Sequence, residues 1–388
     1  MKYFTLPSDF KNSTINRIYE LNNSSDHAKV IETYGNITLG NQFGSGRSLS
    51  QLPKVDFIKL KEYIKYSMSK GIDFDYTFNT SLLNNNEFSE EGIIKIKVFL
   101  KELYDSGVRN ITATLPSLIK IINSMNLDFK IKCSAICSID NANKALEFKS
   151  MGVDRIVVNE LVNRDFETLR RIRRTFGERV ELIVNTPCHI DCNVRMSHYN
   201  QQACDSISET NPVSFNFYEH LCMLRRYGNT GNWLKINFIR PEDLKYYEKI
   251  GINFFKVQGR QTFIKGGDVV KVAEYYFKEE FDGDLVDLIN CFSGLNNFKV
   301  TIPNKSLDGF LKPFYEKENF CIHDCSNCDY CDVFLENVVD INQVKNVCEM
   351  ATQFYQNFDQ FEKLLQKAEP SVLSNKADTM FKTDEFDF

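Results

Sequence analysis

A (β/α)8 barrel of the α/β class is the fold that the sequence predicts, and three observations predict it. Short β-prone apolar segments alternate with amphipathic helical segments along most of the chain. The connections between them are short, which is typical of a parallel sheet covered by helices. The units number about eight over roughly 250 residues, the usual size of a closed barrel. An open doubly wound sheet is the alternative.

The first half of the chain begins with a polar, Asn- and Ser-rich stretch, which we interpret as an N-terminal lead-in over residues 1–30. Strands are then expected at 37–40, 74–78, 110–114 and 130–134. The helices between and after them are expected at 55–68, 89–104, 118–125 and 141–151. Ser89 is a suitable N-cap for the second of these helices, and Gly107 lies just past its end.

The second half continues the alternation with strands at 155–158, 180–184, 233–238 and 254–258. Helices are expected at 165–176, from Pro241 to Gly251 and at 266–277, since proline is favoured in a first helical turn. A long excursion, residues 186–231, separates the sixth and seventh strands. The predicted barrel spans residues 31–296. A cysteine-rich extension with a C-terminal helix follows at 297–370, and the charged end, 371–388, is expected to be a flexible tail.

Composition limits the class of protein. Hydrophobic residues make up 43% and charged residues 26% of the 388 residues, which is ordinary for a soluble globular chain. No apolar run is long enough to span a bilayer, and the N-terminus lacks the pattern of an export signal, so we expect a cytoplasmic protein without a membrane partner. The net charge of −5 argues against nucleic acid as the favoured partner.

Two clusters contain six of the twelve cysteines. Cys188 and Cys192 follow the sixth predicted strand, whereas Cys321, Cys325, Cys328 and Cys331 lie in the extension with C-x3-C-x2-C-x2-C spacing. Thiolates two or three residues apart in a loop can converge on one metal or on one cluster. We expect both clusters to hold iron and sulfur together at the barrel mouth, as one [4Fe-4S] cluster or two. Zinc on the C-terminal four is the alternative.

Polar residues at the ends of the predicted strands form the second group of candidates. In a barrel these ends share one face, and that face holds the active site. Expected substrate-binding residues are Arg47, Asn79, Arg195, Asn237, Arg240, Gln258 and Arg260. Expected catalytic residues are Glu160, His198 and Tyr199, because a carboxylate or an imidazole near a cluster can move a proton.

One segment carries a resemblance to a known family. Residues 254–276 read FFKVQGRQTFIKGGDVVKVAEYY, which resembles the end of the barrel in the peptidase U32 family. Residues 239–244 and 185–199 are also similar to that family. The resemblance implies a [4Fe-4S] cluster and oxygen-independent hydroxylation, as in anaerobic modification of RNA or a ubiquinone precursor, and a second U32-like subunit or an electron donor as partner. The spacing of Cys188 and Cys192 departs from the family's longer array, and the C-terminal cysteines are additional to its barrel.

The reading that follows is an iron–sulfur-dependent hydroxylase or related oxidoreductase acting on a small molecule, a peptide or RNA, with RNA not favoured. A non-catalytic electron-relay subunit of a partner barrel is one alternative. A peptidase is the other, although the sequence has neither an HExxH helix nor a recognisable Ser/His/Asp or Cys/His arrangement.

Overall fold

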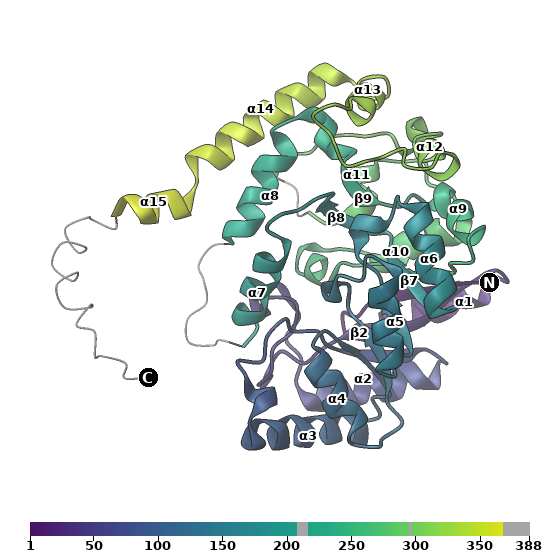
Figure 1. The fold of residues 1–388 in the computed structure, drawn as a ribbon, viewed down its shortest axis with the longest axis vertical. Helices are drawn as coiled ribbons and strands as arrows, with labels where there is room; N and C mark the ends of the chain where they lie inside the picture. Colours follow the sequence, from purple (N-terminus) through teal and green to yellow (C-terminus); the bar gives the residue numbers. More distant parts are fainter. Residues whose placement is uncertain (208–215, 295–296, 368–388) are drawn as a thin grey trace, which may run out of the picture.

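Eight parallel strands close into a barrel in the computed structural model, which describes residues 1–207, 216–294 and 297–367 (Figure 1). The order around the barrel is β1-β10-β7-β6-β5-β4-β3-β2. The strands are β1 (Lys2–Pro7), β2 (Ala28–Gly35), β3 (Asp73–Phe78), β4 (Asn110–Ala113), β5 (Lys130–Cys133), β6 (Arg155–Val157), β7 (Val180–Ile183) and β10 (Phe254–Lys256). The predicted (β/α)8 barrel is thus confirmed.

Helices surround the barrel, because each buries its apolar face on the strands. They are α1 (Asn12–Asn23), α2 (Phe57–Ser69), α3 (Glu90–Asp105), α4 (Pro116–Asn123), α5 (Ala142–Ser150), α6 (Phe166–Phe176), α9 (Leu244–Glu248) and α10 (Val269–Lys278). The N-cap expected at Ser89 is present: its side chain accepts a hydrogen bond from the Gly92 amide of α3. No helix within the described ranges is both long and apolar enough to cross a membrane.

The predicted boundary at residue 31 is wrong, because the barrel begins at Lys2. β1 pairs with both β2 and β10 and therefore closes the barrel. Its Phe4 and Leu6 side chains are fully buried. The polar stretch around them obscured this short strand, and the β-prone residues 37–40 lie instead in the loop that follows β2.

The predicted seventh strand is also placed differently. β9 (Ile236–Phe238) pairs antiparallel with β8 (Asn185–His189) in a two-stranded sheet outside the barrel. Between them the excursion forms α7 (Arg195–Asp205) and α8 (Phe217–Tyr227). The chain leaves the barrel after β7 and returns only at β10, so residues just after β9 do not lie at a barrel strand end.

The C-terminal extension gathers at one end of the barrel (Figure 1). α11 (Leu285–Ile289) precedes the extension, whose helices are α12 (Lys312–Glu316), α13 (Tyr330–Glu336), α14 (Ile341–Asn357) and α15 (Gln360–Lys367). Helix α14 packs on α8. The single helix expected near the C-terminus is interrupted at Phe358 and Asp359. The predicted tail at 371–388 lies outside the described residues.

Candidate functional site

A small cavity of about 60 Å³ lies at the mouth of the barrel, where the carboxyl ends of the strands meet. The structure brings five of the predicted site residues to this cavity: Arg47, Asn79, Tyr199, Gln258 and Arg260. Sequence reasoning missed other lining residues, among them Tyr34, Thr77, Ser134, Lys256 and Gln261. A lysine inside a predicted buried strand was the available signal for Lys256.

Arg260 is held at the mouth by neutral partners. Its Nη1 atom donates hydrogen bonds to Asn36 Oδ1 at 2.5 Å and to Thr77 Oγ1 at 2.8 Å. Burial lowers the pKa of its guanidinium to about 10, and the nearby Arg47 charge acts in the same direction. Among the described residues no carboxylate lies within 4.0 Å of it, so its charge is free to pair with an anionic ligand.

The turn that presents Arg260 depends on Gly259. Its φ of 147° is a conformation that side chains rarely adopt, and a Cβ atom there would lie 2.8 Å from the sulfur of Cys291. The loop that carries Arg47 is held by a hydrogen bond, which the Gly46 amide donates to Asn79 Oδ1 at 3.1 Å. Asn79 therefore fastens the Arg47 loop to the end of β3.

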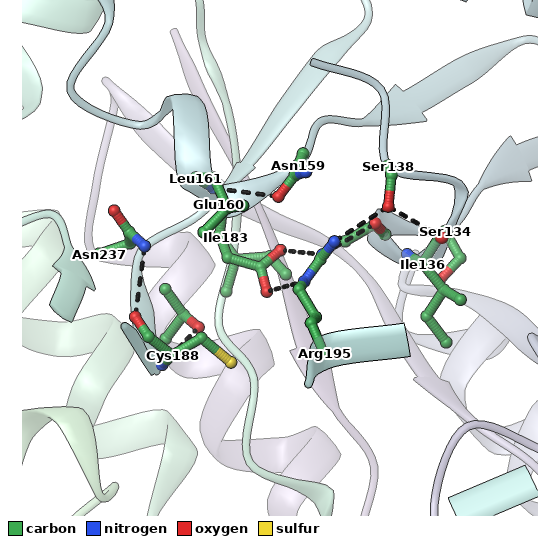
Figure 2. Close-up of polar contacts among 12 residues, drawn as sticks. Ser134, Ile136, Ser138, Asn159, Glu160, Leu161, Ile183, Cys188, Arg195 and Asn237 are labelled. Carbon is green, nitrogen blue, oxygen red and sulfur yellow. Dashed lines mark hydrogen bonds and ion pairs between the residues drawn. The ribbon is translucent and has the colours of Figure 1, made fainter. Parts of the chain in front are cut away.

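Glu160 and Arg195 form a buried ion pair beside the mouth (Figure 2). Arg195 Nη2 lies 2.6 Å from Glu160 Oε2, and Arg195 Nε lies 3.1 Å from Oε1. The other guanidinium contacts go to the Ser138 hydroxyl and the Ala135 carbonyl. Because these contacts occupy the guanidinium, Arg195 positions Glu160 rather than offering a free cation to a substrate.

Tyr199 links this pair to the cavity. Its hydroxyl donates to Glu160 Oε1 at 3.4 Å, and the Arg195 guanidinium lies 5.1 Å from the centre of its ring. Burial and the Glu160 charge raise the pKa of the Tyr199 phenol. The side chain is therefore a protonated hydrogen-bond donor at neutral pH.

His198 lies next to the mouth, but it is not among the residues that line the cavity. Its Nε2 atom contacts the amides of Gln202 at 3.3 Å and Asn216 at 3.4 Å. Burial, with a contribution from Arg47, lowers the pKa of His198 to about 4. The ring is therefore neutral at neutral pH.

Arg240 and Asn237 are two predicted substrate-binding residues that do not reach the mouth cavity. Asn237 lies in β9 and Arg240 comes just after it, and β9 is not a barrel strand. Arg240 is 1% exposed and pairs with Asp243 at 2.8 Å and Asp308 at 3.0 Å. Asn237 is fully buried and donates to the Cys188 carbonyl at 3.2 Å. Arg240 therefore fastens the extension to the barrel, and Asn237 holds the backbone of β8 at Cys188.

Cys188 and Cys192 have Cys222 of α8 as a third thiol in their surroundings. Burial raises the pKa of Cys188 to about 12, and the charges of Glu160 and Cys222 contribute to the rise. Burial and Cys222 also raise the pKa of Cys192. Arg226 Nη2 lies 3.7 Å from the Cys222 sulfur. Figure 2 shows the Cys188 side chain below Glu160, with its sulfur on the side of Arg195.

The four C-terminal cysteines line a different and larger cavity, of about 610 Å³. Arg164 and Lys235 lie beside them, and their charges oppose the rise in the pKa of Cys331 that burial causes, which reaches about 11. Neither Cys188 nor Cys192 lines this cavity. The two stretches meet at His323, whose Nδ1 atom lies 2.9 Å from Asp191 Oδ2.

Both sets of thiols have the donor chemistry that iron–sulfur clusters and zinc prefer. Within the described ranges, however, no group of three or more His, Cys, Asp or Glu side chains is arranged to hold a metal ion. In the described part of the chain the two stretches touch through His323 and Asp191, but their cysteines form no joint metal site. Cluster binding by Cys188, Cys192, Cys321, Cys325, Cys328 and Cys331 therefore stays a prediction.

Comparisons with known proteins agree with the fold. The model of peptidase family U32 matches residues 45–202. A protein of Methanocaldococcus jannaschii named "Uncharacterized protease MJ1657" is 28% identical over 298 residues, 77% of this chain and 86% of that protein. The solved structure of the U32 peptidase Mk0906 superposes with a TM-score of 0.51 at 14% identity, over 67% of this chain and 93% of the other. The family-model match, the relative from M. jannaschii and the shared barrel fold thus make this chain similar to the peptidase U32 family and support its membership of that family.

Proposed function

We propose that this U32 protein is an enzyme that binds a small anionic substrate at the barrel mouth. One observation carries the proposal: Arg47, Lys256 and Arg260 all line one small cavity, and no described carboxylate lies within 4.0 Å of any of their charged groups. Buried cations are normally paired, because an isolated charge costs several kcal/mol to desolvate. An anionic ligand between them would supply the missing partner.

The surrounding residues give the bound anion an asymmetric site. Arg47 and Arg260 offer guanidinium donors that suit a carboxylate or a phosphate. Tyr199 offers a hydroxyl whose proton is shared with Glu160, while Arg195 fixes the orientation of that carboxylate. Glu160 and Tyr199 can therefore hold or move a proton at the edge of the cavity.

An iron–sulfur cluster is the cofactor we propose, and oxygen-independent hydroxylation is the leading reaction type. Cys188 and Cys192 would hold it beside the mouth, with Cys222 as a further thiol in their surroundings. When bound, the cluster would supply electron transfer to or from the substrate. The cysteines at 321, 325, 328 and 331 would hold a second cluster or a zinc ion in their own cavity.

Binding of inorganic phosphate tests the anion site. We expect phosphate to raise the midpoint of thermal unfolding of the wild-type protein, because a ligand that binds the native state stabilises it. Arg260→Met should abolish this shift, and Arg47→Met should reduce it. Arg171→Met is the matched control, since Arg171 pairs with Glu167 on the exposed face of α6. An equal phosphate shift in the wild type and in Arg260→Met would refute the proposed anion site.

Metal analysis tests the cofactor. Protein purified without oxygen should contain iron and acid-labile sulfide in comparable amounts, as cubane clusters do. Cys188→Ala and Cys192→Ala should lose iron, whereas Cys348→Ala should keep it, because Cys348 is a buried side chain of α14. Zinc without sulfide in the wild-type protein would exclude the cluster and leave a structural metal site.

Peptidase activity is the second candidate, because the relative from M. jannaschii is named a protease. Burial and the Glu160 charge raise the pKa of Cys188 to about 12, which disfavours the thiolate that a cysteine peptidase needs. Cleavage of unfolded casein by the purified protein, lost in Cys188→Ala, would favour the peptidase over the hydroxylase.

A further inference from the structure

Lys256 is a buried amine that opens onto the mouth cavity. It ends β10, is 8% exposed, and lines the cavity together with Arg47 and Arg260. Its Nζ atom lies 3.9 Å from the centre of the Tyr34 ring. The hydroxyl of Tyr34 is engaged elsewhere, since it donates to the Val257 carbonyl at 2.8 Å. The ring therefore presents its face, and not a hydrogen-bond acceptor, to the amine.

A second buried lysine shows what Lys256 lacks. Lys132 of β5 pairs with Glu32, with Asp75 at 2.8 Å and with Glu181 at 3.5 Å. These three carboxylates face the barrel interior from β2, β3 and β7, and Arg155 also pairs with Glu32 at 2.9 Å. No carboxylate of the described chain lies within 4.0 Å of the Lys256 amine.

The charges around Lys256 set its protonation. Burial lowers its pKa to about 8, and repulsion from Lys132 acts in the same direction. The more distant carboxylates of Glu181, Asp75 and Glu32 oppose this fall. Arg47 and Arg260 add positive charge on the cavity side. A substantial fraction of the amine is therefore neutral near pH 8, and a neutral amine is a nucleophile.

We propose that Lys256 forms an imine with a small carbonyl compound that carries a carboxylate or a phosphate. The inference rests on the proposed anion site, because Arg47 and Arg260 would hold the anionic group while the carbonyl carbon faces the amine. The cavity, of about 60 Å³, accommodates only the reacting end of such a molecule.

The covalent step balances without any further reactant. The amine lone pair of Lys256 attacks the carbonyl carbon to give a carbinolamine, and loss of the former carbonyl oxygen as water gives the imine. One C=N bond replaces one C=O bond, and no electrons are gained or lost overall. The protonated imine is an electron sink for a later change at the adjacent carbon.

Reductive trapping of the full chain tests the proposal. The protein is incubated with pyruvate and sodium cyanoborohydride, and the modified peptides are mapped by mass spectrometry. Lys256 should be the dominant modified residue, at least about tenfold above exposed lysines, because its amine is more deprotonated at pH 8. Hydroxyacetone, a neutral ketone of similar size, should label Lys256 far less. Pyruvate labelling spread evenly over exposed lysines, or equal labelling by both ketones, would overturn the proposal.

Variants separate this proposal from the anion site. Lys256→Met should lose the adduct, and Lys120→Met, an exposed side chain on α4, should keep it. The wild-type pH profile of labelling, with a half-maximal rate near pH 8, provides a measurement that needs no variant. A phosphate-induced thermal shift without any Lys256 adduct would overturn imine formation and leave the anion site standing. An undiminished adduct in Arg260→Met would overturn the assigned role of Arg260.

Discussion

The guanidinium of Arg195 holds both carboxylate oxygens of Glu160, with contacts of 2.6 and 3.1 Å, in a position where Arg195 is 6% and Glu160 is 1% exposed. This pair joins α7 of the excursion to the short helical turn after β6. The pair accepts a hydrogen bond from the Tyr199 hydroxyl and lies beside Cys188. The arrangement of side chains between the mouth and the first cysteine cluster therefore depends on this ion pair.

Breaking this ion pair should destabilise the protein. Arg195→Met leaves the Glu160 charge buried and uncompensated, which typically costs about 3–5 kcal/mol. Urea denaturation measures the loss in the free energy of unfolding. Arg171→Met removes the exposed pair with Glu167 and should cost less than about 1 kcal/mol. An equal loss of unfolding free energy in the two variants would show that the buried pair stabilises the protein no more than the exposed pair does.

Glu32 should make stability fall in acid. Lys132 and Arg155 hold the pKa of this buried carboxyl at about 2 against the opposing effect of burial. A carboxyl with a depressed pKa in the folded state contributes stability that is present above its unfolded pKa, about 4.5, and lost as the pH falls towards 2. Glu32→Gln should be less stable at pH 7 and should flatten the unfolding curve between those values. Glu102→Gln, on the exposed face of α3, should leave the shape of the curve unchanged.

His198 should also make stability depend on pH, over a different range. Its folded pKa of about 4 lies below the ordinary value of 6.5, so the unfolded chain binds the proton first as the pH falls. The contribution of the neutral ring is complete above pH 6.5 and is lost between about 6.5 and 4. His198→Gln should remove this loss in thermal unfolding measured across that range. The exposed His27→Gln variant should retain the wild-type profile; a wild-type profile in His198→Gln would argue against a neutral, buried ring.

Arg240 and Arg260 should separate stability from ligand binding. Arg240→Met breaks the buried pair with Asp243 and the pair with the exposed Asp308, and it should cost several kcal/mol of unfolding free energy, on the order of 3–5. It should leave the phosphate-induced thermal shift intact, because Arg240 is not at the barrel mouth. Arg260→Met should abolish that shift. Loss of phosphate binding in Arg240→Met at a temperature where the variant is folded would contradict this assignment.

The structure brings only some of the predicted site residues together at the barrel mouth. Arg47, Asn79, Gln258 and Arg260 follow true barrel strands and meet at the mouth, as strand-end reasoning predicts. Arg240 does not reach the mouth, because the strand before it, β9, pairs with β8 outside the barrel. Lys256 was missed although it lies inside a predicted buried strand, because the sequence does not show that its amine packs on the Tyr34 ring and lines the mouth cavity.

The sequence by itself determined the barrel, because alternating strand and helix periodicity is local and recurs in every unit. The two cysteine clusters are also evident from the sequence, because their spacing along the chain does not depend on the fold. Tertiary structure alone decided that β1 closes the barrel, that the four C-terminal cysteines line a cavity without Cys188 and Cys192, and that the Arg195 guanidinium pairs with Glu160. Those outcomes depend on which segments, far apart in the chain, pack against each other. Burial and charge pairing between such segments produce no periodic pattern in the sequence.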